Sequence, residues 1–153
     1  MTRFAAQGGG SGSIYTGGTF SGNPLVMAAG LAAVDEMAAT RETLYPALAE
    51  KTHRFANAIN QFCREENLPA QLMHLGSMFH LHFQADPIES SRDFTRQHAA
   101  AEREFYLHLI GHGVIVPGVH LAFFSAAHND EDVDAVIAAF QQSFHDLRTD
   151  GLI

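Results

Sequence analysis

The sequence contains a single cysteine, a single lysine and no tryptophan among its 153 residues. Cys63 has no partner in the chain, which excludes an internal disulfide and a disulfide-based secreted fold, and we expect it to be a small packed residue. Nine residues are lysine or arginine, against 17 aspartates and glutamates, and the basic residues are scattered singly. Because binding to a phosphate backbone needs clustered basic side chains, we expect no nucleic acid partner.

Long apolar runs are also missing from the sequence. No run approaches the roughly 20 residues of a membrane-spanning helix, and the N-terminus has neither the basic nor the apolar region of a signal peptide. We therefore predict no membrane partner and a cytoplasmic location. Hydrophobic residues make up 46% of the chain and charged residues 17%, a composition typical of a domain with a folded core.

The first part of the sequence predicts an arm followed by helices. Residues 1–13, MTRFAAQGGGSGS, have no hydrophobic periodicity and predict a flexible arm. Asn23 suits the cap of a helix and Pro24 its first turn. The next stretch, LVMAAGLAAVDEMAA, is apolar nearly all round, so we expect this helix to be buried or covered by a partner. Thr40 is the candidate cap of a second helix that runs to about Asn67.

The rest of the sequence predicts strands and helices in alternation. Residues 71–84, QLMHLGSMFHLHFQ, change to a period of two and predict two short strands. A third helix is expected from about Phe94 to Gly111 or Gly113, and VIVP and HLAFFS predict two more strands. Asn129 is the candidate cap of a last helix with acids in its first turn. This order predicts an α+β fold, with helices packed on a small antiparallel sheet of about four strands.

The stretch YTGGTFSGNP, residues 15–24, places glycines and hydroxyl side chains directly before the first predicted helix. Glycine lets the backbone approach an anion, while exposed N–H groups, the helix dipole and a hydroxyl attract it. The stretch is not a nucleotide P-loop, since that motif needs a lysine after its glycines and the chain has only Lys51. Two interpretations stay open on spacing alone: an anion-binding loop, or a glycine connection of the kind that commonly precedes a helix.

Three separated motifs resemble a single family. GGTFSGNPLVMAAGLAAVDEM resembles the segment of class III, pyridoxal-phosphate-dependent aminotransferases that follows their Schiff-base lysine. GTFSGNPLVMAAG, GSMF and FFSAAHNDEDVD are similar to glutamate-1-semialdehyde 2,1-aminomutase and its relatives, and the similarity runs from about Ile14 to the last helix. The resemblance implies the C-terminal small domain of a fold-type I pyridoxal-phosphate enzyme. Residues 1–22 would be an N-terminal arm and cofactor-phosphate loop, and residues 23–153 the small domain with its leading helices.

The resemblance also implies roles for single residues. Thr19 would reach across a dimer interface to the phosphate of pyridoxal 5'-phosphate held by the second subunit, with the backbone of Gly18 and Thr19 as further donors. The family's Schiff-base lysine lies upstream of the matched region, in the large domain. Lys51 is no substitute, because it lies mid-helix beside an apolar stripe and a catalytic lysine needs a desolvated pocket. We therefore predict cofactor-binding residues but no catalytic residue in this chain.

The implied partners are the large cofactor-binding domain, a second subunit of a homodimer, and a small amino, keto or aldehyde substrate. Many family members bind a substrate carboxylate with an arginine on a strand before the last helix. VHLAFFSAAH has none, which agrees with an aminomutase-like branch and with enzymes acting on amines or β-amino acids. Two alternatives to a catalytic role stay open: an assembly module that completes a separately encoded large domain, and a truncated fragment without activity, whose apolar surface would be exposed.

Four further residues invite a chemical interpretation. His80 and His82 share one side of a predicted strand, where two imidazoles could bind one metal. No cysteine or acidic ligand falls at a recognisable spacing, so we predict polar or interface positions and no metal. Ser125 and His128 lack the Gly-x-Ser-x-Gly turn and the orienting acid of a hydrolase. We expect a structural hydrogen bond at His128.

Overall fold

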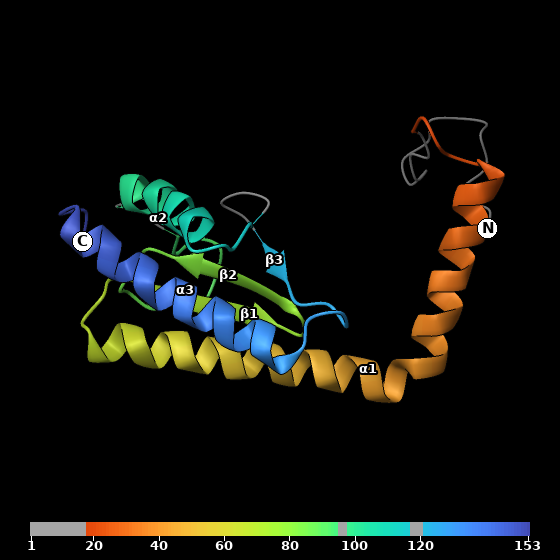
Figure 1. Cartoon of the computed structure of the whole chain (residues 1–153), viewed down its shortest axis with the longest axis horizontal. Coiled ribbons are helices and arrows are strands. Elements are labelled where there is room, and N and C mark those ends of the chain that lie inside the picture. Colours follow the sequence, from red (N-terminus) through yellow and green to blue (C-terminus); the bar gives the residue numbers. More distant parts are fainter. Residues whose placement is uncertain (1–17, 95–97, 117–120) are drawn as a thin grey trace. The chain divides into compact units, whose positions relative to one another are not determined.

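The computed structural model describes residues 18–94, 98–116 and 121–153. The chain divides into two compact units, Met1–Arg41 and Glu42–Ile153, which are described separately. The elements labelled in Figure 1 are the helix α1 (Pro24–Glu65), the strands β1 (Gln71–Leu75) and β2 (Met78–His82), the helix α2 (Ala99–Gly111), the strand β3 (Ala122–Phe123) and the helix α3 (Asp130–Thr149). Within the described ranges, no helix has both the length and the apolar character that crossing a membrane requires.

α1 is one helix of 42 residues, where the sequence predicted two. Thr40, the predicted cap of the second helix, lies inside α1 and its Oγ1 donates a hydrogen bond to the Glu36 carbonyl at 2.8 Å. A helical threonine can make this bond to the carbonyl four residues earlier without ending the helix. The helix also continues through Pro46, in spite of the backbone donor that a proline lacks. The prediction of two helices was therefore wrong at Thr40.

The three described strands form an antiparallel sheet in the order β1-β2-β3. In its register Leu72 lies opposite Leu81, and both side chains are buried. The predicted α+β class is confirmed, with three described strands in place of about four. β3 takes up only two residues of the predicted HLAFFS strand. Residues 114–116 of the predicted VIVP strand lie outside any strand, and Pro117 lies outside the described residues.

The C-terminus of α2 explains why VIVP does not begin as a strand. α2 ends at Gly111, as predicted, although it begins later than the expected start near Phe94. Gly113 has a φ of +82°, and the Val114 N–H donates to the Leu109 carbonyl at 2.9 Å. This combination is the glycine-dependent closure of a helix C-terminus. The backbone of Val114 thus completes α2 instead of extending the sheet.

α3 begins with the predicted cap. Asn129 Oδ1 accepts a hydrogen bond from the Asp132 N–H at 2.9 Å, and Asp132 Oδ2 accepts one from the Asn129 N–H at 2.8 Å. This reciprocal pair is a capping box, which satisfies two backbone donors at the helix start. The cap predicted at Asn129 is confirmed.

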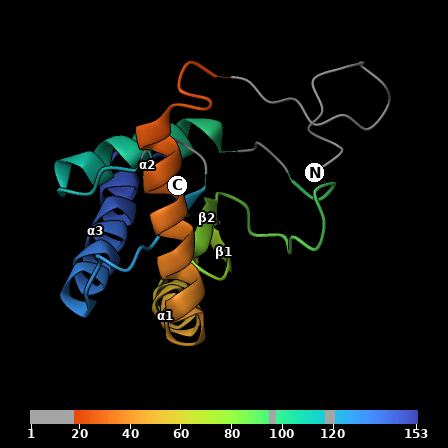
Figure 2. The same ribbon diagram turned by 90° about the vertical axis from the view of Figure 1, so that its right-hand side faces the viewer.

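Aromatic side chains form the centre of the core in the unit Glu42–Ile153. Phe55 of α1 is fully buried and contacts Phe79 of β2, Phe124 and Phe140 of α3 edge to face, at centroid distances of 4.9, 5.4 and 5.0 Å. Phe105 of α2 joins them through Phe140 at 5.2 Å. Figure 2 shows α3 on one side of the strands and the segment after β2 on the other. The core therefore lies between the helices and one face of the sheet.

The edge strand β1 is attached to α1 by a side-chain amide. Asn60 Nδ2 donates to the Leu72 carbonyl at 2.8 Å, and Asn60 Oδ1 accepts from the Leu72 N–H at 2.7 Å. One amide side chain thus satisfies both backbone groups of a residue whose outer side has no neighbouring strand in the described sheet. This pair fixes the position of β1 against the helix.

Candidate functional site

The stretch predicted to bind the cofactor phosphate forms two consecutive turns ahead of α1. The Ser21 N–H donates to the Gly18 carbonyl at 3.0 Å, and the Asn23 N–H donates to the Phe20 carbonyl at 3.1 Å. Gly18 and Gly22 have φ values of +147° and +76°, a region that residues with a Cβ rarely adopt. These two glycines therefore determine the shape of the turns and do more than loosen the chain.

Asn23 caps α1, as predicted. Its Oδ1 accepts hydrogen bonds from the N–H groups of Leu25 at 3.0 Å and Val26 at 3.3 Å. Because these N–H groups have no partner inside the helix, they are donors that an anion at a helix N-terminus would use. Asn23 already binds both of these donors. An anion at this end of the helix would therefore have to bind to the turn, where the Thr19 side chain is exposed. The assignment of Gly18 and Thr19 to a cofactor phosphate stays a prediction.

The described part of the unit Met1–Arg41 exposes a continuous series of apolar side chains. Every described residue from 18 to 39 is exposed. The larger apolar side chains among them, with exposed fractions from 47% to 79%, are Phe20, Leu25, Val26, Met27, Leu31 and Val34. Soluble proteins rarely expose contiguous apolar surface of this kind without a partner. The sequence predicted a helix that is either buried or covered by a partner, and the described residues of its own unit leave it exposed.

Lys51 and His128 both form hydrogen bonds in the turn that precedes α3. Lys51 Nζ donates a hydrogen bond to the His128 carbonyl. His128 Nδ1 accepts from the Ser125 N–H at 2.9 Å and lies 3.0 Å from Ser125 Oγ. Since a backbone N–H can only donate, this nitrogen carries no proton, and the hydroxyl donates to it as well. The structural hydrogen bond expected at His128 is present.

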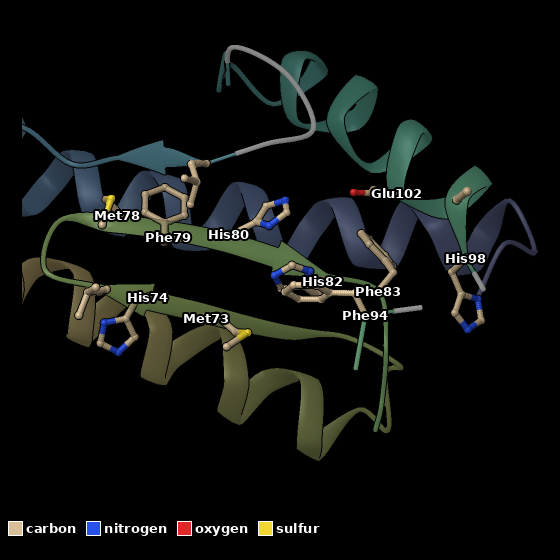
Figure 3. Close-up of a pocket in the computed structure, with 13 residues that line it drawn as sticks. Met73, His74, Met78, Phe79, His80, His82, Phe83, Phe94, His98 and Glu102 are labelled. Atoms are coloured by element: carbon tan, nitrogen blue, oxygen red, sulfur yellow. The ribbon is translucent and has the colours of Figure 1, made fainter. Parts of the chain in front are cut away.

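A cavity of about 610 Å³ lies on the sheet face opposite the core (Figure 3). Met73 of β1 and His80 of β2, which face each other across the two strands, form part of its floor together with His82. Phe94 and Glu102, the latter in the first turn of α2, form part of its walls. These side chains come from both strands, from α2 and from the segment between β2 and α2.

His82 is held between two aromatic rings. Its ring stacks on Phe94 at a centroid distance of 4.8 Å and meets His80 edge to face at 4.2 Å. Burial, together with the charge of His80 when protonated, lowers the pKa of His82 to about 4. At neutral pH this imidazole is uncharged and adds an aromatic surface with hydrogen-bonding nitrogens. Among the described residues, no group of three or more His, Cys, Asp or Glu is arranged to hold a metal ion.

Phe94 and Glu102 are among the cavity residues that were not identified from the sequence. Phe94 was placed in the third helix, whereas it lies before α2 and packs on His82. Glu102 has only the local signal of an acid near a helix start, which ordinarily indicates a favourable interaction with the helix dipole. The antiparallel pairing of β1 with β2 and the position of α2 bring these residues to one cavity, and neither is visible in local spacing.

Comparison with known proteins finds relatives over most of the chain. No protein-family model matches the sequence. Glutamate-1-semialdehyde 2,1-aminomutase from Laribacter hongkongensis is 37% identical over 140 residues, which cover 87% of this chain and 31% of the relative. Among solved structures, an omega-transaminase from Sphaerobacter thermophilus matches with a TM-score of 0.74 and 27% identity, covering 92% of this chain and 32% of its own.

A third relative adds to the agreement in fold. A glutamate-1-semialdehyde aminomutase variant from Pseudomonas aeruginosa PAO1, in complex with PMP, matches with a TM-score of 0.64 and 21% identity, covering 86% of this chain and 29% of its own. This chain thus spans about a third of the length of the relatives it matches. Sequence identity and fold agree, and the chain belongs to the class III pyridoxal-phosphate-dependent aminotransferase family.

Proposed function

We propose that this chain is the C-terminal portion of a pyridoxal-phosphate-dependent aminotransferase or aminomutase and acts together with a large domain that carries the Schiff-base lysine. In this proposal residues 1–22 are the arm and cofactor-phosphate loop, and residues 23–153 are the small domain with its leading helices. The observation that carries the proposal is the GTFSGNP motif, which forms glycine-shaped turns with an exposed Thr19 directly before α1. The reaction is amino-group transfer, of the kind named for glutamate-1-semialdehyde 2,1-aminomutase.

The residues of the turn fit a phosphate group. A threonine hydroxyl and backbone N–H groups in a glycine-shaped turn are donors that bind phosphate oxygens. We assign this role to the Thr19 hydroxyl and to the backbone of Gly18 and Thr19. Pyridoxal 5'-phosphate supplies an electron sink for amino-group transfer when bound, while the protein supplies binding and orientation. The contribution of this chain is to bind the phosphate end and so hold the cofactor in place for the second subunit of a homodimer.

The exposed apolar surface of α1 supports a role that needs a partner. Leu25, Leu31 and Val34 are each more than half exposed, at 79%, 63% and 57%. Contact with the large domain or with a second subunit would remove this surface from water. The same observation favours a second candidate, a non-catalytic assembly module that completes a separately encoded large domain. The two candidates differ in whether Thr19 affects cofactor binding.

The experiment combines the 153-residue chain with a shortened Laribacter aminomutase. The shortened protein lacks the third that matches this chain and keeps the large domain. We expect aminotransferase activity from the mixture and none from this chain alone. The substitution Thr19→Val removes the hydroxyl at nearly constant volume and should weaken cofactor binding by about tenfold, the effect of one hydrogen bond to a charged group. Thr19→Ser should retain the affinity, and Thr40→Val, which removes the hydroxyl that donates to the Glu36 carbonyl within α1, is the matched control.

Two outcomes would contradict the proposal. If the wild-type chain restores activity and Thr19→Val binds the cofactor as tightly as wild type, the chain is an assembly module and the phosphate role is wrong. If the isolated chain forms a borohydride-reducible bond to the cofactor at Lys51 and turns over an amino donor, the catalytic lysine lies in this chain. The first is measured by cofactor titration of the mixture, and the second by peptide mass spectrometry with an activity assay.

A further inference from the structure

Two histidines and a methionine come together on the open face of the sheet. His80 and His82 alternate with buried residues along β2, so both side chains lie on the face away from the core. Met73 of β1 lies directly opposite His80 in the register, where the Cβ atoms of paired residues are about 5 Å apart. All three side chains line the same cavity. Figure 3 shows the two imidazole rings on β2 and the Met73 side chain on the neighbouring strand.

The two imidazole rings lean toward each other. Residues two positions apart on a strand are separated by about 6 to 7 Å along the backbone. The ring centroids of His80 and His82 are only 4.2 Å apart, at an interplanar angle of 75°. Phe94 stacks on the His82 ring at a centroid distance of 4.8 Å and so fixes its orientation. Ring nitrogens of both histidines can therefore approach a single ion without a change in the backbone.

This set of side chains points to a soft metal ion. Among the described residues, no three His, Cys, Asp or Glu are arranged to hold an ion, so the usual ligand set of zinc is incomplete here. A thioether sulfur is a soft ligand that selects Cu(I), and imidazole also binds copper. The sequence predicted no metal because no cysteine or acid falls at a recognisable spacing from His80 and His82. The pairing of β1 with β2 supplies Met73 instead, a ligand that local spacing does not show.

The surroundings of the three side chains favour the lower oxidation state of copper. The rest of the cavity lining is mainly apolar and includes Phe79, Phe83 and Leu121. Apolar surroundings disfavour the more highly charged Cu(II), and the cavity of about 610 Å³ gives an ion a path to the strands. Met78 also lines the cavity, but it lies two residues before His80, on the side away from His82. Met73 is therefore the methionine placed to complete the set.

We propose that this face of the sheet binds one Cu(I) ion through the imidazoles of His80 and His82 and the thioether of Met73. The ion binds as Cu(I) and does not change its oxidation state. The site uses only residues of the unit Glu42–Ile153 and needs neither pyridoxal 5'-phosphate nor the large domain. It therefore goes beyond the proposed function, and the failure of one leaves the other unaffected.

The test titrates the 153-residue chain with Cu(I) under anaerobic, reducing conditions in competition with a chromogenic Cu(I) chelator. We expect a single ion per chain, and X-ray absorption at the copper edge should show a sulfur ligand together with imidazole nitrogens. Cys63→Ala should bind Cu(I) as tightly as wild type, because Cys63 is buried in α1, outside the cavity lining. The absence of binding, a bound ion without a sulfur ligand, or loss of the ion in Cys63→Ala would overturn the proposal without any variant of the site itself.

Further variants locate the ion. Met73→Leu removes the sulfur at similar volume and should weaken Cu(I) binding at least about tenfold, while the affinity for Zn(II) stays unchanged. Met37→Leu is the matched control, because Met37 and Met73 are both 38% exposed and Met37 lies in the unit Met1–Arg41. His82→Phe keeps an aromatic ring against Phe94 and should weaken the binding of both metals. Thermal unfolding checks that each variant is folded, and equal Cu(I) affinities of Met73→Leu and Met37→Leu would show that the proposal is wrong.

Discussion

His112, which directly follows α2, and Asp146 of α3 are joined by a hydrogen bond of 2.6 Å between Nε2 and Oδ2. This bond is the main reason why the pKa of Asp146 lies below its usual value, with a further hydrogen bond from Gln142 at 3.3 Å. A neighbouring pair, His108 Nε2 of α2 and Asp150 Oδ2 at 2.9 Å, links α2 to the residue that directly follows α3. The C-terminal part of α2 is therefore attached to α3 by two imidazole–carboxylate pairs as well as by apolar packing.

The Asp146 bond predicts a specific dependence of stability on pH. A carboxyl whose pKa is lowered by folding stabilises the protein above its unfolded pKa, and this contribution is lost as the pH falls through the folded value. Asp146→Asn should therefore lower Tm by a few degrees at about pH 5, and the difference from wild type should shrink below about pH 4, the ordinary carboxyl pKa. Thermal unfolding followed by circular dichroism measures this. Asp35→Asn, which changes an exposed residue of α1, is the control, and a Tm difference that stays constant down to pH 2 would contradict the prediction.

Truncation of Phe55 should lower the free energy of unfolding more than truncation of any other core residue. Its ring is fully buried and contacts three other phenylalanine rings. Phe55→Ala removes these contacts and leaves a cavity, with an expected loss of about 3 to 5 kcal/mol in the free energy of unfolding. Leu107→Ala, at a position 55% exposed on α2, should cost less than about 0.5 kcal/mol. Urea denaturation compares the two, and similar costs would show that Phe55 is not central to the core.

The capping box of α3 predicts coupled effects at Asn129 and Asp132. Asn129→Ala should lower the free energy of unfolding by about 1 kcal/mol, whereas Asn129→Ser should retain most of the stability because serine is also a good cap. The double variant with Asp132→Ala should cost less than the sum of the two single variants, since each residue satisfies the other's backbone N–H. A double-mutant cycle measured by urea denaturation gives the coupling, and strict additivity would contradict the box.

Cys63 should be unreactive while the chain is folded. Only 2% of its surface is exposed, and burial raises the pKa of its thiol to about 12. Since the thiolate is the reactive form, the folded chain holds roughly a thousandfold less of it than an ordinary thiol at the same pH. Thiol titration with a chromogenic disulfide at about pH 8 should be slow in buffer and fast in denaturant. Rapid reaction of one thiol per chain in buffer would show that this part of α1 is not packed.

The apolar side chains of the unit Met1–Arg41 should cause self-association of the isolated chain. The double substitution Leu31→Ser with Val34→Ser removes two of them and should shift the population toward monomer in analytical ultracentrifugation. It should leave the unfolding of the unit Glu42–Ile153 unchanged, because both positions lie outside it. Leu107→Ser, at an exposed position on α2, is the matched control. Equal association of all three proteins would show that this surface does not drive contact between chains.

Much of the fold follows from local patterns. Asn129 was identified because an amide before an acidic turn is a strong cap signal, and Asn23 because it precedes a proline and an alanine-rich stretch. Thr40 was misassigned because its hydroxyl has two possible uses, capping a new helix or bonding back to Glu36. Sequence alone does not decide between them. The α+β class was predictable because the change from helical to strand periodicity near residue 71 is clear.

The relationships across the fold were not predictable in the same way. His112 and Asp146 are far apart in sequence, and each is a partly exposed residue near the end of a helix, so no spacing rule pairs them. Glu102 and Phe94 meet at one cavity only because β1 pairs with β2 and α2 lies beside that sheet. Val114 was assigned to a strand from its β-branched side chain, although its backbone closes α2. In each case a contact between distant segments outweighed the local preference.

The amide of Asn60 has a consequence for solubility. A strand at the edge of a sheet offers unpaired N–H and carbonyl groups on which a strand from another molecule can add, and repeated addition leads to aggregates. At Leu72 the N–H and the carbonyl are both already hydrogen-bonded to the Asn60 side chain. An incoming strand would need hydrogen bonds to these same two groups. An added strand would have to displace this amide first, so the outer edge of β1 is blocked at Leu72 against intermolecular pairing.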